Sequence, residues 1–140
     1  MIHSPLAGAK AVLCFLLALG MLGALGCGKG KAKVHGKVTL DGKDVSAGTI
    51  SFFPVDGKGQ TAAGIIKDGS YTAEVPPGSM RVEIRAPKVT GKRPSFNAPN
   101  SPTQDTFEET IPAKFNIESK LVREIKAGSP VENFELKSTE

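Results

Sequence analysis

A strict alternation of apolar and charged residues constrains this chain more than any other feature. The stretch 79–86 reads Ser-Met-Arg-Val-Glu-Ile-Arg-Ala, and every second side chain from Met80 onward is apolar. A repeat of two residues places the apolar side chains on one face of an extended strand and the charged ones on the other. The stretch therefore predicts a half-buried β-strand whose second face lies in water.

Further strands are predicted on both sides of this stretch. Runs of strand character lie at 33–40, 50–52, 60–67 and 71–75 before it, and at 114–126 and 131–136 after it. Lys67-Asp-Gly-Ser70 is typical of a hairpin turn, because Gly69 accepts the positive φ that such turns require. Six or seven short strands, with no amphipathic helix longer than a turn or two, predict an all-β fold, an antiparallel seven-stranded sandwich.

The phase of each predicted strand also indicates which side chains form the core. The residues predicted to be buried are apolar or aromatic and occupy inward positions in the two-residue repeat. They are Val38, Leu40, Ile50, Phe52, Ile65, Tyr71, Val75, Val82, Ile84, Leu121, Ile125 and Phe134.

The first 26 residues have the layout of a secretory signal peptide. Lys10 precedes an uncharged, mostly apolar run at 11–26, and small residues follow. A membrane-spanning helix needs about 20 apolar residues, so this run is short for a permanent span. We therefore expect residues 1–26 to form a signal helix that is cleaved from an exported protein.

A cysteine stands directly after this segment. The run Leu22-Gly-Ala-Leu-Gly-Cys27 resembles the lipobox of bacterial lipoproteins, although Ala24 stands where these boxes usually have leucine. The resemblance implies that Cys27 is acylated and becomes the N-terminus of a membrane-anchored protein facing the periplasm or the exterior. The alternative is an incidental cysteine, like Cys14. Residues 27–33 then form a flexible basic tether, whose lysines either approach anionic headgroups or simply extend a linker.

A series of short motifs follows the predicted strands and turns. They are His35-Gly-Lys-Val38, Asp41-Gly-Lys-Asp-Val45, Gly48-Thr-Ile-Ser-Phe52, Lys67-Asp-Gly-Ser-Tyr71 and Pro77-Gly-Ser-Met-Arg-Val82. In this order they resemble carboxypeptidase regulatory-like domains, and the tail from Ile111 to Leu136 is similar to the ending of small bacterial lipoproteins that carry this domain. The resemblance, over residues 34–138, implies a transthyretin-like or immunoglobulin-like sandwich. It also implies an accessory module without catalytic residues of its own.

The segment 87–112 interrupts the strand pattern. It holds half of the ten prolines of the chain, and proline fixes φ and removes a backbone donor, which excludes a central strand. We expect a long loop without regular structure, which is either a partner-contact site or disordered without function. The candidate contact residues are Lys88, Lys92, Arg93, Phe96, Phe107, Glu108 and Glu109.

Residue patterns for catalysis, metal binding and phosphate binding are missing from the sequence. His35 is the one histidine after Cys27, and it has no cysteine or second histidine with which to form a metal site or a nucleophile–base pair. Asp41, Asp56 and Asp68 each precede a glycine, as turn residues do, and no loop has the ligand spacing of a calcium site. We therefore expect no enzyme activity, no metal and no cofactor.

The sequence thus predicts a lipid-anchored, non-catalytic module of the cell envelope with a binding or structural role. The expected partners are the membrane, through the N-terminal lipid, and an unidentified envelope protein or polysaccharide. Nucleic acid is not expected, because the net charge of +4 is spread along an exported chain. A soluble exported carbohydrate-binding module is the alternative, although the chain has no Trp, and its one tyrosine, Tyr71, has an inward strand phase.

Overall fold

A computed structural model describes residues 30–139 of the chain. The signal segment 1–26, Cys27 and the start of the tether 27–33 lie outside the described residues. Within that range the fold is all-β, with one short 3₁₀ helix, η1 (Ala113–Phe115). Its strands are β1 (Ala32–Leu40), β2 (Lys43–Asp44), β3 (Ala47–Pro54), β4 (Ala62–Lys67), β5 (Ser70–Val75), β6 (Gly78–Arg85), β7 (Pro87–Pro94), β8 (Thr103–Glu109), β9 (Val122–Ile125) and β10 (Phe134–Leu136).

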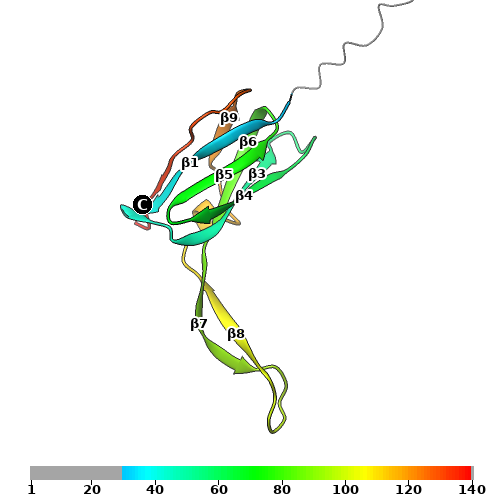
Figure 1. Ribbon diagram of the computed structural model, residues 1–140, viewed down its shortest axis with the longest axis vertical. Helices are drawn as coiled ribbons and strands as arrows, with labels where there is room; N and C mark the ends of the chain where they lie inside the picture. Colours follow the sequence, from blue (N-terminus) through cyan, green and yellow to red (C-terminus); the bar gives the residue numbers. More distant parts are fainter. Residues whose placement is uncertain (1–29, 140) are drawn as a thin grey trace, which may run out of the picture.

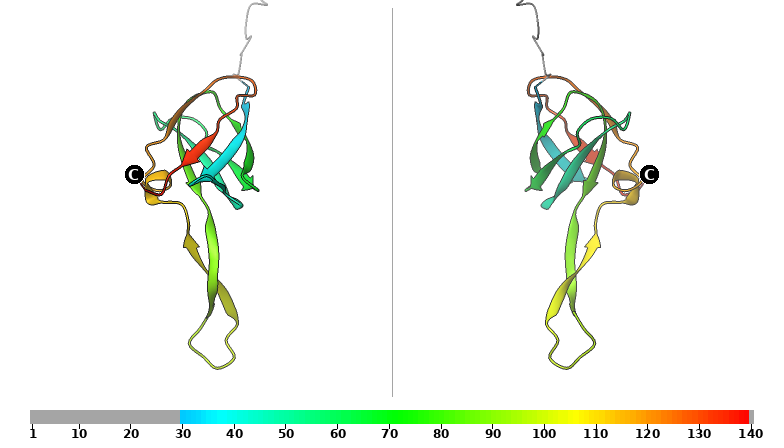
Figure 2. Two further views of the ribbon diagram at one scale, coloured as in Figure 1. Left: turned by 90° about the vertical axis from the view of Figure 1, so that its left-hand side faces the viewer. Right: turned by 90° about the vertical axis from the view of Figure 1, so that its right-hand side faces the viewer.

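Eight of these strands form the body of the molecule. Their order is β10-β1-β5-β4-β3-β6-β9, and β2 pairs with the end of β1. All neighbours are antiparallel except β1 and β10, which run parallel. β1 lies between β5, which pairs with its residues 32–37, and β10, which pairs with its residues 38–40. The sheet curls around one interior like a half-barrel (Figures 1 and 2).

The concave side of the curled sheet carries the core, and most of the predicted core residues lie there. The predicted residues that are buried are Val38, Ile50, Phe52, Tyr71, Val75, Val82, Ile84, Ile125 and Phe134. Leu40 and Leu121 are partly buried and pack against them. The core also includes Ala32, Val34, Val45, Ile66, Ala73, Met80, Ala86, Ile111 and Leu136. The two-residue repeat of 79–86 is confirmed in β6, where Met80, Val82 and Ile84 point inward.

The core prediction is wrong at Ile65. Its side chain is 72% exposed, whereas that of Ile66 is 1% exposed. The turn between β4 and β5 sets the register, because it places Ile66 opposite the inward-facing Tyr71. Gly64 then also faces inward, where a Cβ atom would lie 2.6 Å from the carbonyl oxygen of Thr72. The close approach of β5 therefore requires a residue without a side chain at this position.

The segment that leads into β10 runs parallel to β1 along its edge. The Glu132 amide donates to the His35 carbonyl at 2.9 Å, and the Tyr71 hydroxyl donates to the Glu132 carbonyl at 2.8 Å. Gly36 allows this approach, since a Cβ atom there would lie 2.0 Å from the Glu132 carbonyl oxygen. Arg123 of β9 reaches the same segment through an ion pair with Glu132 at 3.4 Å. These contacts join the two outer strands of the sheet.

The segment 87–112, expected to lack regular structure, instead forms a β-hairpin. β7 and β8 pair antiparallel from Pro87↔Glu109 to Pro94↔Thr103, and they form a separate two-stranded sheet. The prolines do not prevent this pairing, because Pro87 and Pro94 are the first and last residues of β7 and β8 contains none. The hairpin projects from one end of the body, and β1 begins at the other end (Figure 1).

Candidate functional site

The β7–β8 hairpin brings together the residues that the sequence marked as candidate contacts. Lys88 lies opposite Glu108, Lys92 lies opposite Asp105 and Arg93 lies opposite Gln104. The Lys92 ammonium and the Asp105 carboxylate are 4.0 Å apart. One strand is therefore basic and the other acidic, so part of the charge is neutralised within the hairpin itself.

The two faces of the hairpin differ in chemistry. In β8 the side chains alternate without a break, so Phe107 and Asp105 share one face while Glu108 and Thr106 share the other. Val89 is the cross-strand partner of Phe107 and lies on its face. The hairpin thus has an apolar pair beside an ion pair on one face and only polar groups on the other.

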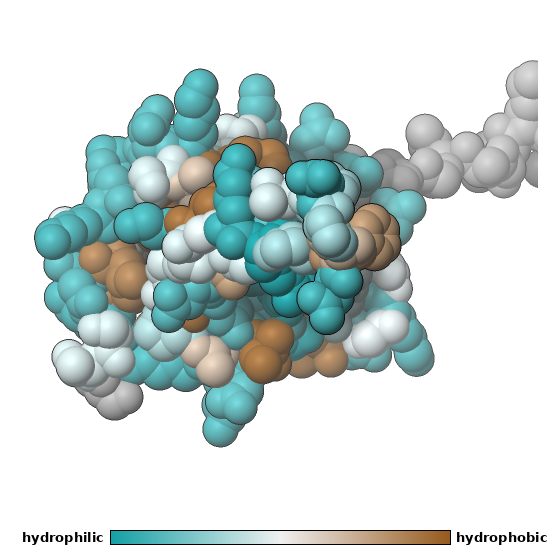
Figure 3. Space-filling view, turned by 90° about the horizontal axis from the view of Figure 1, so that it is seen from below, coloured by the Kyte–Doolittle hydropathy of each residue, from teal (hydrophilic) through white to brown (hydrophobic). Residues whose placement is uncertain are grey.

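The apolar side chains of the hairpin are open to solvent. Phe107 is 64% exposed, Val89 is 48% exposed, and Phe96 in the tip between the strands is 69% exposed. Every residue of β7 is exposed, and in β8 only Thr106 is partly covered. The hairpin end of the molecule is mostly hydrophilic with separate apolar patches (Figure 3). Exposed aromatic side chains on a projecting element are a common feature of contact surfaces.

Glu109 differs from the other candidate residues because it fixes the base of the hairpin. Its carboxylate accepts hydrogen bonds from the Ala86 amide at 2.8 Å and from the Ile111 amide at 3.0 Å. The Thr110 hydroxyl adds a bond to the Ala86 carbonyl at 2.7 Å. Ala86 and Ile111 belong to the core, so these bonds join the hairpin to the buried part of the body.

A groove of about 500 Å³ lies beside the base of the hairpin. Its residues come from the end of β1, from β2 and the start of β3, and from both sides of the hairpin base. Val45, Ala86 and Ile111 give it an apolar floor, and Asp41 stands at its side. Hydrogen bonds from the side chain and the backbone of Ser138 hold the pKa of Asp41 below its ordinary value. Asp41 is thus an ionised side chain fixed at the groove.

A second groove, of about 380 Å³, lies between residues 54–60 and residues 76–80. Neither groove is lined by an aromatic side chain.

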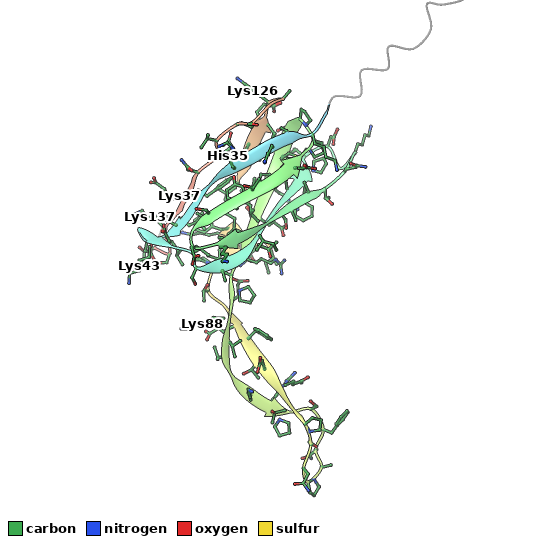
Figure 4. All side chains as sticks on the ribbon, viewed as in Figure 1. His35, Lys37, Lys43, Lys88, Lys126 and Lys137 are labelled. Atoms are coloured by element: carbon green, nitrogen blue, oxygen red, sulfur yellow. The ribbon has the colours of Figure 1, made fainter. Side chains whose placement is uncertain are left out.

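A row of basic side chains also runs along the side of β1 toward the hairpin base (Figure 4). It consists of His35, Lys37, Lys43, Lys88, Lys126 and Lys137. No ion pair within residues 30–139 includes these lysines, which is typical of a solvated charged surface.

The remaining sequence predictions about sites have these outcomes. Cys27 lies outside the described residues. Tyr71 is buried, as its strand phase predicts, and burial raises the pKa of its hydroxyl. Among residues 30–139, no three His, Cys, Asp or Glu side chains lie close enough to hold a metal ion, and no helix is long and apolar enough to cross a membrane.

Two parts of the candidate site were missed from the sequence. Val89 completes the apolar pair with Phe107, and the available signal was a proline-free stretch at 103–109 with strand-favouring Thr and Phe. The groove at the hairpin base joins Val45, Ala86 and Ile111, which are far apart in the chain, so no local pattern indicates it. No protein-family model, curated protein or solved structure matches this chain.

Proposed function

We propose that this protein is a lipid-anchored, non-catalytic module of the cell envelope, and that it presents the β7–β8 hairpin to an envelope protein. The anchor would be a lipid on Cys27, which follows the apolar segment 11–26. The hairpin would supply the partner contact through Phe96, Phe107 and the charged residues of both strands.

The arrangement of the two ends of the molecule carries this proposal. β1 begins at the end of the body opposite the hairpin (Figure 1). A tether that enters at Ala32 would therefore place the body next to the membrane and direct the hairpin away from it. Groups at the far end of an anchored module are the ones most accessible to other envelope proteins.

The exposure of the hairpin gives further support. A two-stranded hairpin in water is at best marginally stable, and this one has no covering layer within the described residues. Phe107 and Val89 nevertheless occupy paired positions in its middle. Contact with a partner would bury both side chains, which would stabilise the complex in proportion to the apolar area removed from water.

We further propose that the body is a sandwich of the carboxypeptidase regulatory-like, transthyretin-like type. The motifs that carry this resemblance fall on successive elements: His35–Val38 in β1, Gly48–Phe52 in β3, Lys67–Tyr71 at the β4–β5 turn and Pro77–Val82 at the start of β6. The Asp41-Gly42 and Asp68-Gly69 turns have the positive φ values that suit such hairpins. A soluble carbohydrate-binding module has weaker support, because the two grooves described above offer no aromatic side chain for stacking on sugar rings. Phe115 lines a third groove of about 370 Å³, but the Lys114 ammonium lies over its ring, 5.0 Å from the centroid.

Two measurements test the envelope function. Mass spectrometry of the membrane-extracted protein should show an acylated Cys27 at the N-terminus, and Cys27→Ala should move the protein to the aqueous fraction. Replacement of residues 88–108 by Asn-Gly should abolish crosslinks to other envelope proteins while the protein remains at the membrane. A soluble mature protein contradicts the anchor, and unchanged crosslinks contradict the role of the hairpin.

A further inference from the structure

We propose that the outer edge of β8 accepts an extended, basic segment of a partner polypeptide as a third strand of the hairpin sheet. This inference rests on the proposed function and specifies how the partner binds. It follows from a difference between the two outer edges of the hairpin.

Both outer edges of the hairpin are unpaired within residues 30–139. β7 and β8 form a two-stranded sheet, and neither has a second neighbour. In an antiparallel pair, alternate N–H and C=O groups of each strand point away from the partner strand. Such an edge is a template for another strand unless the chain protects it.

β7 carries several features that protect an edge. Pro87 and Pro94 at its two ends have no N–H to donate. A bulge between Val89 and Gly91 interrupts the regular ladder. Lysines at 88 and 92 add charge to the same strand. Prolines, bulges and lysines are the means by which natural edge strands avoid pairing with other strands.

β8 has neither a proline nor a bulge, and the charges that protect it are of one sign only. Its seven residues, Thr103–Glu109, include no proline and no lysine, and they alternate in phase without interruption. Thr and Phe at its centre favour the extended conformation. Its charged side chains are all acidic: Glu109 is held at the hairpin base, and Asp105 and Glu108 lie along the strand. The open edge therefore favours a partner strand that is basic.

β7 itself shows which side chains complement those of β8. Lys88 lies opposite Glu108, Val89 opposite Phe107 and Lys92 opposite Asp105. In a three-stranded sheet, each β8 side chain would have one cross-strand partner on β7 and a second on the added strand. The side chains that suit β8 on the added strand are therefore of the same types as those of β7 at the paired positions. An antiparallel partner without a bulge would read Lys-Val-Thr-Lys opposite the residues from Glu108 to Asp105.

A second copy of the chain fits this edge less well. Two β8 strands side by side would line one junction with the acidic side chains of both copies, and like charges close to each other across strands are destabilising. A β7 strand from another copy would offer its protected outer edge. The occupant is therefore a different polypeptide with basic and apolar residues in the stated order.

The test uses the full chain in detergent micelles and a fluorescent capped peptide, Thr-Lys-Val-Thr-Lys-Thr. Binding is measured by fluorescence anisotropy, and amide hydrogen exchange locates the contact. We expect saturable binding and added protection of backbone amides within residues 103–109, but not within 88–94. A peptide with Glu in place of both Lys residues should not bind.

Two further peptides separate strand addition from charge attraction. One carries N-methyl groups at the odd positions and the other at the even positions, so both keep the side chains of the parent peptide. In an added strand, alternate N–H groups face β8, so one of the two should lose binding and the other should keep it. Equal binding of both methylated peptides would mean that only charge attracts them, which overturns the proposal.

Protein variants complete the test. Asp105→Asn with Glu108→Gln should weaken peptide binding about tenfold, because both charge pairs are lost. The matched control, Glu74→Gln with Glu135→Gln, removes two exposed carboxylates of the body and should leave binding unchanged. Circular dichroism verifies that each variant is folded.

The remaining outcomes also decide the proposal. No binding at about 1 mM peptide overturns it, as does association of the chain with itself through residues 103–109. If the Asp105/Glu108 variant keeps its envelope crosslinks while the Asn-Gly replacement of 88–108 loses them, the hairpin binds a partner in another way. The proposed function then stands and this inference falls.

Discussion

The body and the hairpin of this protein are built from the same kind of strand pair, yet they differ in what lies against them. Phe52 in the middle of β3 is completely buried, whereas Phe107 in the middle of β8 is 64% exposed. Each has a cross-strand partner on an antiparallel neighbour, Val82 for Phe52 and Val89 for Phe107. The comparison shows that strand pairing determines the shape of both regions, and that the curl of the larger sheet supplies a core to one of them only.

This difference separates the region that stabilises the fold from the region that we propose binds a partner. Burial of an apolar side chain contributes roughly 1.5–3 kcal/mol relative to its exposure, so the body holds most of the folding free energy. The hairpin depends on cross-strand pairs, each of which contributes about 0.2–1 kcal/mol, and on the hydrogen bonds at its base. Substitutions in the body should therefore lower the free energy of unfolding, whereas substitutions in the hairpin should weaken partner binding and leave the free energy of unfolding almost unchanged.

The largest expected difference in the free energy of unfolding is between a Phe→Ala substitution in the body and one in the hairpin. Phe52→Ala should lower the free energy of unfolding by about 3–5 kcal/mol, because a fully buried ring leaves a cavity. Phe107→Ala should change it by less than about 0.5 kcal/mol. Chemical denaturation of both variants gives the comparison. Similar losses in the two variants would show that the hairpin is packed against something in solution.

A second pair of variants tests the division between inward and outward positions within one strand. Ile66→Ala should cost about 2–4 kcal/mol, while Ile65→Ala at the adjacent exposed position should cost no more than about 0.5 kcal/mol. Because the residue type is the same, propensity differences cancel. A larger loss at Ile65 would mean that β4 has the opposite register, and the two-residue repeat would then be shifted throughout the strand.

The sequence was informative wherever charged and apolar residues alternate. In β6 each of the three inward residues is followed by a charged side chain, so only one face can be buried. In β4 the stretch Ala-Ala-Gly-Ile-Ile has no charged residue to distinguish the faces, and its register depends on the turn at Asp68-Gly69 and on Tyr71 across from Ile66. The register of β4 is thus determined by the neighbouring strand and not by its own sequence, which explains the wrong prediction at Ile65.

The hairpin shows a different limit of sequence analysis. The proline content of 87–112 is high as a whole, yet the prolines occupy the strand ends, the tip and the exit, where they are compatible with pairing. The candidate contact residues all lie on this hairpin, and how they pair depends on the positions of single prolines. The groove at the hairpin base has no local signal, because it forms only when β1, β3 and the hairpin base meet.

A smaller effect should arise at the junction between the two regions. Glu109→Ala removes the acceptor of the Ala86 and Ile111 amides, and it should cost about 1–2 kcal/mol because two backbone donors lose their partner. Glu108→Ala is the matched control, since Glu108 is an exposed residue of β8 opposite Lys88, and its loss should stay within about 0.5 kcal/mol. Thermal unfolding distinguishes the two. Equal losses would refute the anchoring role of Glu109.

Tyr71→Phe should have a still smaller effect, about 1 kcal/mol at neutral pH, because it removes one hydrogen bond to the Glu132 carbonyl. Burial raises the pKa of Tyr71 in the folded protein above that of the unfolded chain. Above about pH 10 the unfolded state therefore loses the phenol proton first, and the stability of the unmodified protein falls. The deficit of Tyr71→Phe should shrink above that pH. Denaturation at a series of alkaline pH values measures it, and a constant deficit would contradict the assigned burial.

The smallest expected effect on stability belongs to removal of the hairpin itself. Pro87 and Glu109 are cross-strand partners, so Asn-Gly in place of residues 88–108 can close the gap as a two-residue turn. The hydrogen bonds of Glu109 and Thr110 at the base are retained, and no buried side chain is lost. The melting temperature should therefore change by no more than about 3 °C. As a control, replacement of 88–110 also removes the bonds at the base and should lower the melting temperature further. A large drop with the shorter replacement would mean that the hairpin contributes to the core, and the division between a stable body and an exposed hairpin that is free to bind a partner would have to be abandoned.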